Sequence, residues 1–216
     1  MSSLLLSAAA AIPVKTWLLR ALEQEGGNAT FDLTIERRPF FLYPGGAHHI
    51  KPWGERVDAL YHPTASAGLA ALGRAAGYSF DMSAPLSDTT DSHRLVLWAE
   101  RQQRAKGEAL ALAVGRRYFE QARALADHAV LLEAAAEVGL DRAAALAYLQ
   151  SDEGREEVWQ AAVDAQRQGI HSIPVFMFSA GEFSETVHGS ADVERFSQVF
   201  QAIKRHWKAR EASSCS

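Results

Sequence analysis

The segment at residues 169–178, which reads GIHSIPVFMF, limits the folds open to this chain more than any other. Pro174 excludes a continuous helix, because its ring clashes with the preceding turn and forces Ile173 out of the helical conformation. The next residues, 175–178, are bulky and apolar, which is typical of a strand buried on both faces. The sequence therefore predicts that a helix ends near Gly169 and that a buried strand begins directly after the proline.

The composition is that of a globular protein, with 216 residues, 48% of them hydrophobic and 22% charged. A chain of this length can form one domain with a large insertion or two small domains. The formal net charge is −4 and Lys and Arg form no cluster, so we expect no nucleic acid partner. No apolar run is long enough to cross a membrane, and we expect no membrane partner. Cys215 is the only cysteine, which excludes an intramolecular disulfide.

The amino-terminal region predicts a strand, a helix and a second strand. Residues 4–14 are apolar enough to suggest a signal peptide, but no Lys or Arg precedes them, so we expect a strand at about residues 3–8 and a cytoplasmic protein. A helix runs from Pro13 to about Gln24 and ends at a Gly-Gly pair. Residues 30–35 alternate apolar and polar side chains, as a strand with one buried face does. This order predicts a parallel pair joined by a right-handed crossover.

The middle of the chain, residues 64–168, has helical periodicity almost throughout and is rich in alanine, which favours helices. Asp127 and Asp141 stand where helix caps are expected. After the strand that follows Pro174 we expect a short strand at 185–187 and a terminal helix at about 191–208. In the middle region we expect helices at residues 64–76, 91–106, 108–122, 127–138, 141–149 and 151–168.

Together these elements predict an α/β protein, with a thioredoxin-like fold and a large all-helical domain inserted between the second and third strands. We expect the thioredoxin-like domain in two parts, residues 1–63 and 169–211. The inserted helical domain lies between them, at 64–168. Residues 212–216 are expected to form a disordered tail.

Three histidines, His48, His49 and His62, lie in a loop-like region and invite interpretation as a metal site. Adjacent histidines usually point apart, and no carboxylate stands at the spacing of a further ligand. We therefore interpret them as solvated loop residues and expect no metal.

Several segments, taken in order, resemble the DsbA family of thioredoxin-fold oxidoreductases. They include RRPFFLYP, DTTDSHRLVLWA and AQRQGIHSIPVFMF, and together they span nearly the whole chain. Within the family the chain is similar to the FrnE-like branch, which is related to 2-hydroxychromene-2-carboxylate isomerases and kappa-class glutathione transferases. The segments lie at residues 37–44, 88–99, 126–141, 149–158, 165–178 and 187–196.

The resemblance implies a binding groove at the proline. Pro174 would be cis and would face the start of the first helix at Pro13. The backbone N–H and C=O of Ile173 would then pair with an extended peptide or with glutathione. His171 is in a position to line the same groove.

The chain departs from the family at the start of the first helix. There the family carries Cys-Pro-x-Cys, or a serine-containing sequence in the glutathione-using relatives. The matching residues here are Ile12, Pro13, Val14 and Lys15, and a register one residue later ends at Thr16 without supplying a thiol. Because disulfide exchange needs a thiolate, we do not expect dithiol redox catalysis.

Lys15 and Thr16 are the candidate site residues that remain at this helix start. The free backbone N–H groups of a first helical turn and the charge of Lys15 suit an anion, such as the thiolate or a carboxylate of glutathione. The alternative is that Lys15 is simply solvated. Thr16 could bond a bound thiolate, or it could cap its own backbone.

A second group of candidates is expected at the start of the helix near residue 91. Asp91 or Ser92 is the expected cap. His93 is a candidate general acid or base, because its ordinary pKa lies near neutrality, and the alternative is that it packs locally. We interpret Arg94 as one partner of an interdomain ion pair.

Two functions follow from these residues. In the first, a DsbA-like protein without dithiol chemistry binds a peptide or a small thiol in the groove beside Pro174. In the second, the protein is a glutathione-dependent isomerase or transferase in which His93 assists the reaction and the thiol cofactor is held by Ile173, Pro174, Lys15 and Thr16. Glutathione is the only cofactor that either function suggests.

Overall fold

The computed structural model describes residues 2–7, 11–41, 55, 58, 64–189 and 191–214. It divides into two compact units. The first consists of Met1–Phe40 and Ala165–Ser216, and the second is Phe41–Asp164. His48, His49 and His62 lie outside the described residues.

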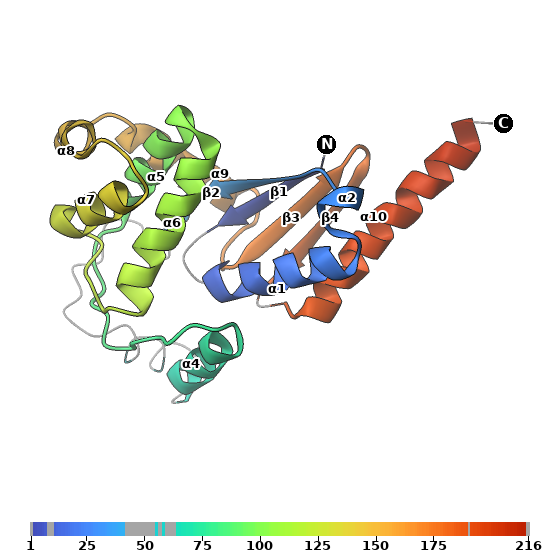
Figure 1. Ribbon diagram of the computed structural model, residues 1–216, viewed down its shortest axis with the longest axis horizontal. Coiled ribbons are helices and arrows are strands. Elements are labelled where there is room, and N and C mark those ends of the chain that lie inside the picture. Colours follow the sequence, from blue (N-terminus) through green and yellow to red (C-terminus); the bar gives the residue numbers. More distant parts are fainter. Residues whose placement is uncertain are drawn as a thin grey trace. The chain divides into compact units, whose positions relative to one another are not determined.

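A four-stranded mixed sheet forms the centre of the first unit (Figure 1). Its strands run in the order β2-β1-β3-β4. The parallel pairing of β1 with β2 confirms the predicted strand–helix–strand crossover, and β3 is antiparallel to both β1 and β4. The strands are β1 (Ser2–Ser7), β2 (Leu33–Arg38), β3 (Val175–Ala180) and β4 (Phe183–His188).

Strand β3 is buried on both faces, as its apolar sequence predicts. Phe176 and Phe178 point to one face and belong to the main core of the unit. Val175 and Met177 alternate with them and pack on the opposite face, in a smaller cluster with Phe40. The run of apolar side chains at residues 175–178 is explained by this burial on both faces.

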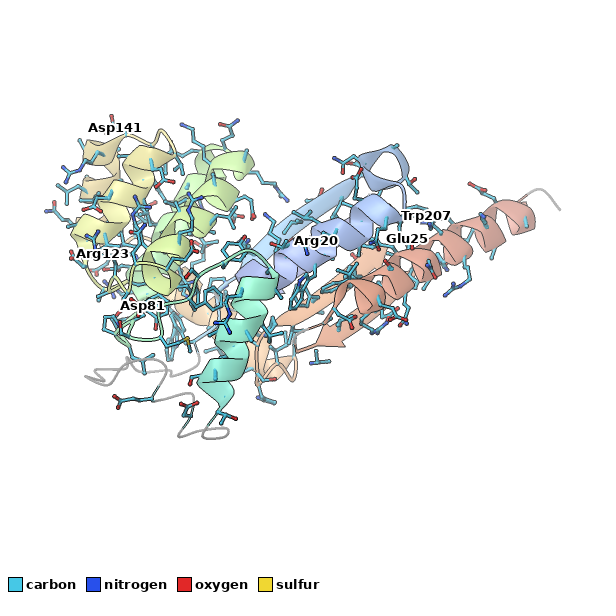
Figure 2. The ribbon with its side chains drawn as sticks, turned by 60° about the horizontal axis from the view of Figure 1, so that its bottom comes forward. Arg20, Glu25, Asp81, Arg123, Asp141 and Trp207 are labelled. Atoms are coloured by element: carbon cyan, nitrogen blue, oxygen red, sulfur yellow. The ribbon has the colours of Figure 1, made fainter. Side chains whose placement is uncertain are left out.

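Helices α1 (Ala11–Gln24) and α10 (Val193–Ser214) contribute to the same core as Phe176 and Phe178. Phe31 and Phe200 are central to it, with ring centroids 4.9 Å apart. Glu25, which follows the end of α1, lies beside α10 (Figure 2). It accepts a hydrogen bond of 2.8 Å from Gln201 and pairs with Lys204, both on α10. Helix α10 therefore runs alongside α1 on this face of the sheet.

The start of β2 and the end of α10 differ from the sequence prediction. Strand β2 begins at Leu33 rather than at residue 30, because the short helix α2 (Gly27–Thr30) occupies the preceding residues. Helix α10 continues to Ser214, so residues 212–214 are helical and the prediction of a disordered tail is wrong for them. Cys215 lies outside the described residues.

The second unit consists of packed helices. Asp127 and Asp141 cap two of them as predicted, each by accepting a hydrogen bond of 2.8 Å from a backbone N–H in the first turn. α9 begins in this unit and its last residues belong to the first unit. The helices are α4 (Ala65–Ala75), α5 (Thr90–Gln102), α6 (Arg104–Phe119), α7 (His128–Glu137), α8 (Arg142–Gln150) and α9 (Arg155–Arg167).

Candidate functional site

The peptide bond between Ile173 and Pro174 is cis. Pro174 is buried, and its carbonyl accepts a hydrogen bond of 2.8 Å from the N–H of Gly189, which extends the pairing of β3 with β4 by one step. Within the described part of the chain, neither the N–H nor the C=O of Ile173 has a hydrogen-bond partner. The backbone at Ile173 therefore has both a donor and an acceptor for an incoming ligand.

The start of α1 lies at the same end of the sheet as Pro174. Leu6 pairs with Phe176, so the carboxyl end of β1 is beside the first residues of β3. Helix α1 begins at Ala11, four residues after Ser7, and four residues span at most about 14 Å. The first residues of α1 therefore lie near the end of the sheet at which β3 begins (Figure 1).

Lys15 is buried at this helix start, with an exposed fraction of only 9%. It is three residues before Leu18 and seven before Leu22, which places it on the buried face of α1. Burial and, to a smaller extent, the charge of Arg37 together lower the pKa of the Lys15 ammonium to about 8. The alternative of a merely solvated Lys15 is therefore wrong.

Arg37 is the site residue that sequence reasoning missed. Strand β2 continues to Arg38, and alternation places Arg37 on the same face as Leu33 and Ile35, which pack against the core containing α1. The sequence contained a signal for this position, because the alternation of buried and exposed residues along β2 continues from Ile35 to Arg37.

The remaining candidates in this unit differ in exposure. Thr16 and Ile173 are half-buried, whereas His171 is exposed. Pro13 lies in the first turn of α1. Its side chain is outside the described residues.

His93 belongs to the helical unit, whereas the other candidates belong to the unit with the sheet. It lies in the first turns of α5, half-buried, and its ring meets that of Phe41 edge-on at 5.4 Å between centroids. This contact agrees with the local packing that the sequence left open for His93.

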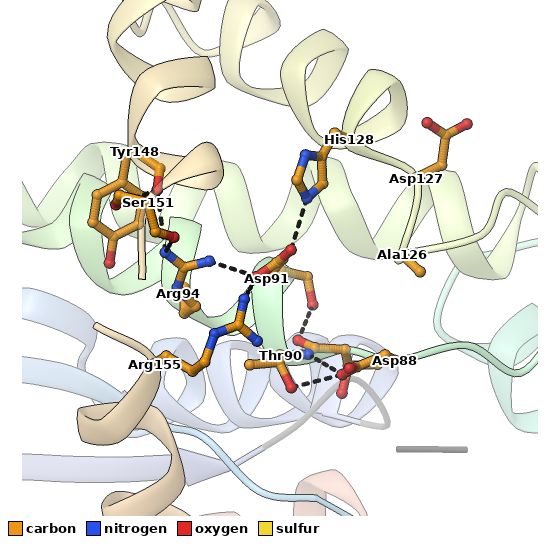
Figure 3. A network of polar contacts seen from close by, with 12 residues as sticks. Asp88, Thr90, Asp91, Arg94, Ala126, Asp127, His128, Tyr148, Ser151 and Arg155 are labelled. Atoms are coloured by element: carbon orange, nitrogen blue, oxygen red, sulfur yellow. Dashed lines mark hydrogen bonds and ion pairs between the residues drawn. The ribbon is translucent and has the colours of Figure 1, made fainter. Parts of the chain in front are cut away.

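Arg94 is completely buried and holds the helical unit together (Figure 3). Its Nη1 donates to Asp91 Oδ1 at 2.6 Å, and its Nε donates to the carbonyl of Glu153 at 2.8 Å. Its Nη2 donates to the carbonyls of Ser151 and Tyr148, at 2.6 and 3.1 Å. All these partners lie in the same unit, so the prediction of an interdomain ion pair is wrong.

Asp91 is the partner of Arg94 rather than a helix cap. Burial alone would raise the pKa of Asp91, but hydrogen bonds from His128 and Arg94 and their charges bring it below its usual value. His128 Nε2 lies 2.7 Å from Asp91 Oδ2, and Arg155 lies 3.6 Å from Oδ1 (Figure 3). The predicted cap is therefore wrong, because the carboxylate of Asp91 turns toward these side chains.

The cap interaction before α5 comes from Asp88. Its Oδ1 accepts hydrogen bonds from the N–H of Thr90 at 2.8 Å and from the Thr90 hydroxyl at 2.6 Å. The hydroxyl of Ser92 donates to the carbonyl of Thr89 at 2.7 Å, so Ser92 does not cap the helix either.

The described residues contain no helix that is both long and apolar enough to cross a bilayer. The same residues contain no group of three His, Cys, Asp or Glu side chains that could hold a metal ion.

The sheet order, the crossover and the proline before β3 define a thioredoxin-like fold with a helical insertion. The DSBA-like thioredoxin domain matches residues 19–201, and the chain belongs to this family. It has one cysteine and therefore no Cys-x-x-Cys pair.

Solved structures agree with this assignment. A probable DsbA oxidoreductase from Streptomyces coelicolor is 25% identical, with a TM-score of 0.76 over 94% of this chain and 90% of its own. A 2-hydroxychromene-2-carboxylate isomerase is 14% identical, with a TM-score of 0.65 over 99% of each chain. The cytosolic disulfide reductase DsbM from Pseudomonas aeruginosa, solved with glutathione, is 18% identical, with a TM-score of 0.54 over 97% of this chain and 99% of its own. No protein of curated function matches this chain in sequence.

Proposed function

We propose that this protein is a DsbA-like thioredoxin-domain protein that does not carry out dithiol exchange and that binds an anionic peptide or small thiol at the start of α1. The observation that carries the proposal is the burial of Lys15 beside Arg37, at the position where the family carries a redox cysteine. Lys15 stands at the position of the family's second cysteine, and Ile12 at that of the first.

The chemistry of disulfide exchange supports the first half of the proposal. A thiolate must attack a disulfide sulfur, and a second thiol must then resolve the mixed disulfide. Neither Lys15 nor Thr16 supplies sulfur, and the only cysteine of the chain, Cys215, lies 200 residues after Lys15.

The chemistry of the site supports an anionic ligand with a peptide-like backbone. The N–H and C=O of Ile173 can pair with an extended segment, in the manner of an added strand. Lys15 and Arg37 can form charge-assisted hydrogen bonds with a carboxylate or a thiolate. Glutathione combines these features, since it is a peptide with two carboxylates and a thiol.

Calorimetric titration with glutathione tests this proposal. We expect binding at millimolar concentrations or below, and about tenfold weaker binding by Lys15→Gln, which corresponds to the loss of one charged hydrogen bond. Lys208→Gln is the matched control, because Lys208 is an exposed lysine on α10. The affinity of this variant for glutathione should equal that of the wild type. The absence of glutathione binding, or equal affinity of Lys15→Gln and wild type, would contradict the proposed site.

An insulin reduction assay tests the loss of dithiol exchange separately. We expect no reduction above the rate with dithiothreitol alone. A rate increase in proportion to the protein concentration would show that the protein exchanges disulfides after all.

The second candidate function is a glutathione-dependent isomerase or transferase, favoured by the half-buried Thr16 beside Lys15. A threonine hydroxyl can donate a hydrogen bond to a thiolate, and Lys15 would stabilise its charge. The ultraviolet absorbance of bound glutathione would then show a lowered thiol pKa in the wild type and a higher one in Thr16→Val. An unchanged thiol pKa on binding excludes this function. A cytoplasmic location accompanies either proposal, as it does for the cytosolic DsbM.

A further inference from the structure

Strand β4 is an edge of the four-stranded sheet, because the order β2-β1-β3-β4 gives it a neighbouring strand on one side only. It pairs with β3 in an unbroken antiparallel register from Phe183 to His188. On its other side, β4 has no partner strand in the described part of the chain. An edge of this kind is a template for pairing with another strand.

The hydrogen bonds between β3 and β4 show which backbone groups of β4 point outward. The N–H of Gly189 donates to the carbonyl of Pro174 at 2.8 Å, so these two residues form a hydrogen-bonded pair. Such pairs alternate with pairs whose N–H and C=O groups point away from each other. The outward-pointing groups of β4 are therefore those of Ser184, Thr186 and His188. Among the described residues, these N–H and C=O groups bond to no other group.

The outer edge of β4 lacks the features that usually prevent pairing between sheets. Ser184, Thr186 and His188 are exposed, and the strand contains no lysine, no proline and no break in register. Its only acidic residue, Glu185, points to the other face and pairs with Arg195 of the same chain. The opposite edge strand, β2, instead ends in three charged residues.

We propose that β4 pairs with β4 of a second copy of this chain, in antiparallel orientation, across a two-fold axis at Thr186. In this register Thr186 lies opposite the same residue of the second copy, and Ser184 lies opposite His188. Three residues on each strand, each with one donor and one acceptor, allow about six hydrogen bonds between the copies. The two sheets then form one continuous sheet. This surface does not include Lys15, and the inference does not depend on the anion site.

The side chains and the register favour a second copy as the partner. On the exposed face two threonines meet at the axis, which is a favourable cross-strand pair. On the other face Glu185 lies opposite Val187 of the second copy, so the two carboxylates are not directly opposite each other. A register shifted by one residue would place the outward N–H of Thr186 opposite a residue whose own backbone groups bond β3. The two-fold arrangement at Thr186 avoids this mismatch and uses all the outward groups.

A charge exchange at residue 186 tests the inference on the full chain. Sedimentation velocity should show that the wild type dimerises with a Kd of about 1–100 µM, since edge pairing buries little apolar surface. Thr186→Lys alone and Thr186→Glu alone should each dimerise about tenfold more weakly or less, because like charges would lie directly opposite each other. An equimolar mixture of these two variants should restore the dimer. Asn28→Lys, at an exposed residue of α2 in the same unit, is the matched control and should dimerise as the wild type does.

Three results of this experiment would overturn the inference. The first is a wild type that stays monomeric at about 500 µM, well above the expected Kd. The second is a dimer that either charged variant forms as readily as the wild type, which would place the interface elsewhere. The third is a mixture of the two variants that dimerises no better than each variant alone. Thermal unfolding shows whether each variant is folded.

Amide hydrogen exchange gives a second test that needs no variant. The amides of Ser184, Thr186 and His188 should exchange more slowly as the concentration of the wild type rises through the Kd. The amides of Glu185 and Val187 already bond β3 and serve as the internal reference. Exchange at the outward amides that does not depend on protein concentration would also overturn the inference.

Discussion

Lys15 is the buried cation of the candidate site. A buried ammonium is costly, and it is retained only where a compensating role or partner exists. Its position was visible in the sequence three residues before Leu18. Its burial was not, because the depth of the first helical turn depends on how α1 packs against the sheet. The proximity of Arg37 depended on the same packing.

The pKa of Lys15 predicts how stability changes with pH. The folded value of about 8 lies below the ordinary value of 10.5. Between these two pH values the unfolded chain holds a proton that the folded chain lacks, so stability rises with pH across this window. Each pKa unit corresponds to about 1.4 kcal/mol, and solvent screening reduces the total, so we expect a gain of about 1–2 kcal/mol.

Urea unfolding of the wild type and of Lys15→Met measures this effect at two pH values, about 7.5, just below the window, and about 10, near its upper end. The difference between the two proteins removes the contributions of other titrating groups. Lys15→Met should be the more stable protein at the lower pH, and its advantage should shrink at the higher pH. A difference that does not depend on pH would show that Lys15 has an ordinary pKa.

Among the helices, Arg94 links the start of α5 by hydrogen bonds to the end of α8 and to the connection between α8 and α9. It bonds the carbonyls of Tyr148, Ser151 and Glu153, none of which a shorter side chain could reach. Removing its charge would also leave Asp91 without its buried partner.

Arg94→Met should therefore lower the free energy of unfolding by about 3 kcal/mol or more. Arg101→Met is the matched control, because Arg101 pairs with Glu157 at the surface of the same unit and should contribute about 0–1 kcal/mol. Chemical denaturation of both variants gives the two values. Similar losses for both would mean that the buried network does not stabilise the helical unit.

Gly107 sets the distance between α5 and α6. A Cβ at this position would lie 2.1 Å from the Glu100 side chain and 3.0 Å from its backbone Cα. Gly68, in α4, has no atom within 4 Å of the same position. Both glycines lie inside helices, so they differ only in the space around them.

Gly107→Ala should destabilise the protein by about 1–3 kcal/mol, because the helices must move apart. Gly68→Ala should instead stabilise it by about 0.5–1 kcal/mol, since alanine favours the helix. Thermal unfolding compares the two. An increase in stability for Gly107→Ala would show that α5 and α6 are not in close contact there.

The elements that could be predicted from sequence are those with a local signal. Asp127 and Asp141 cap their helices because a side chain two or three residues from a free N–H needs no tertiary information. Asp91 has the same residue type and was misinterpreted, because its partners His128 and Arg155 are distant in sequence. The start of β2 was misplaced for a similar reason, since the turn of α2 uses residues that also fit the alternating pattern.

At the scale of the whole molecule, the fold was predictable and the chemistry was not. Pro174, the apolar strand after it and the order of elements are enough to specify a thioredoxin-like fold with a helical insertion, and the family match agrees. The candidate site is defined by Lys15 on α1 and Arg37 on β2, two residues from different elements. No local sequence motif indicates that Lys15 and Arg37 belong to the same site.

The single cysteine gives a prediction at this scale. Cys215→Ser should leave glutathione affinity and the absence of insulin reduction unchanged, because the proposed site contains no sulfur. Calorimetry and the reduction assay on this variant measure both. A loss of glutathione binding in Cys215→Ser would mean that the ligand is held by a mixed disulfide rather than by cations.

An anion site at Lys15 can be tested by a pH titration of this residue, using nuclear magnetic resonance of isotope-labelled lysine side chains with and without glutathione. Lys15→Gln assigns the signal. We predict a midpoint near pH 8 for the free protein and a higher midpoint with glutathione, because a bound anion favours the charged amine. A midpoint near the ordinary lysine value, or one that glutathione does not move, would contradict an anion site built on Lys15.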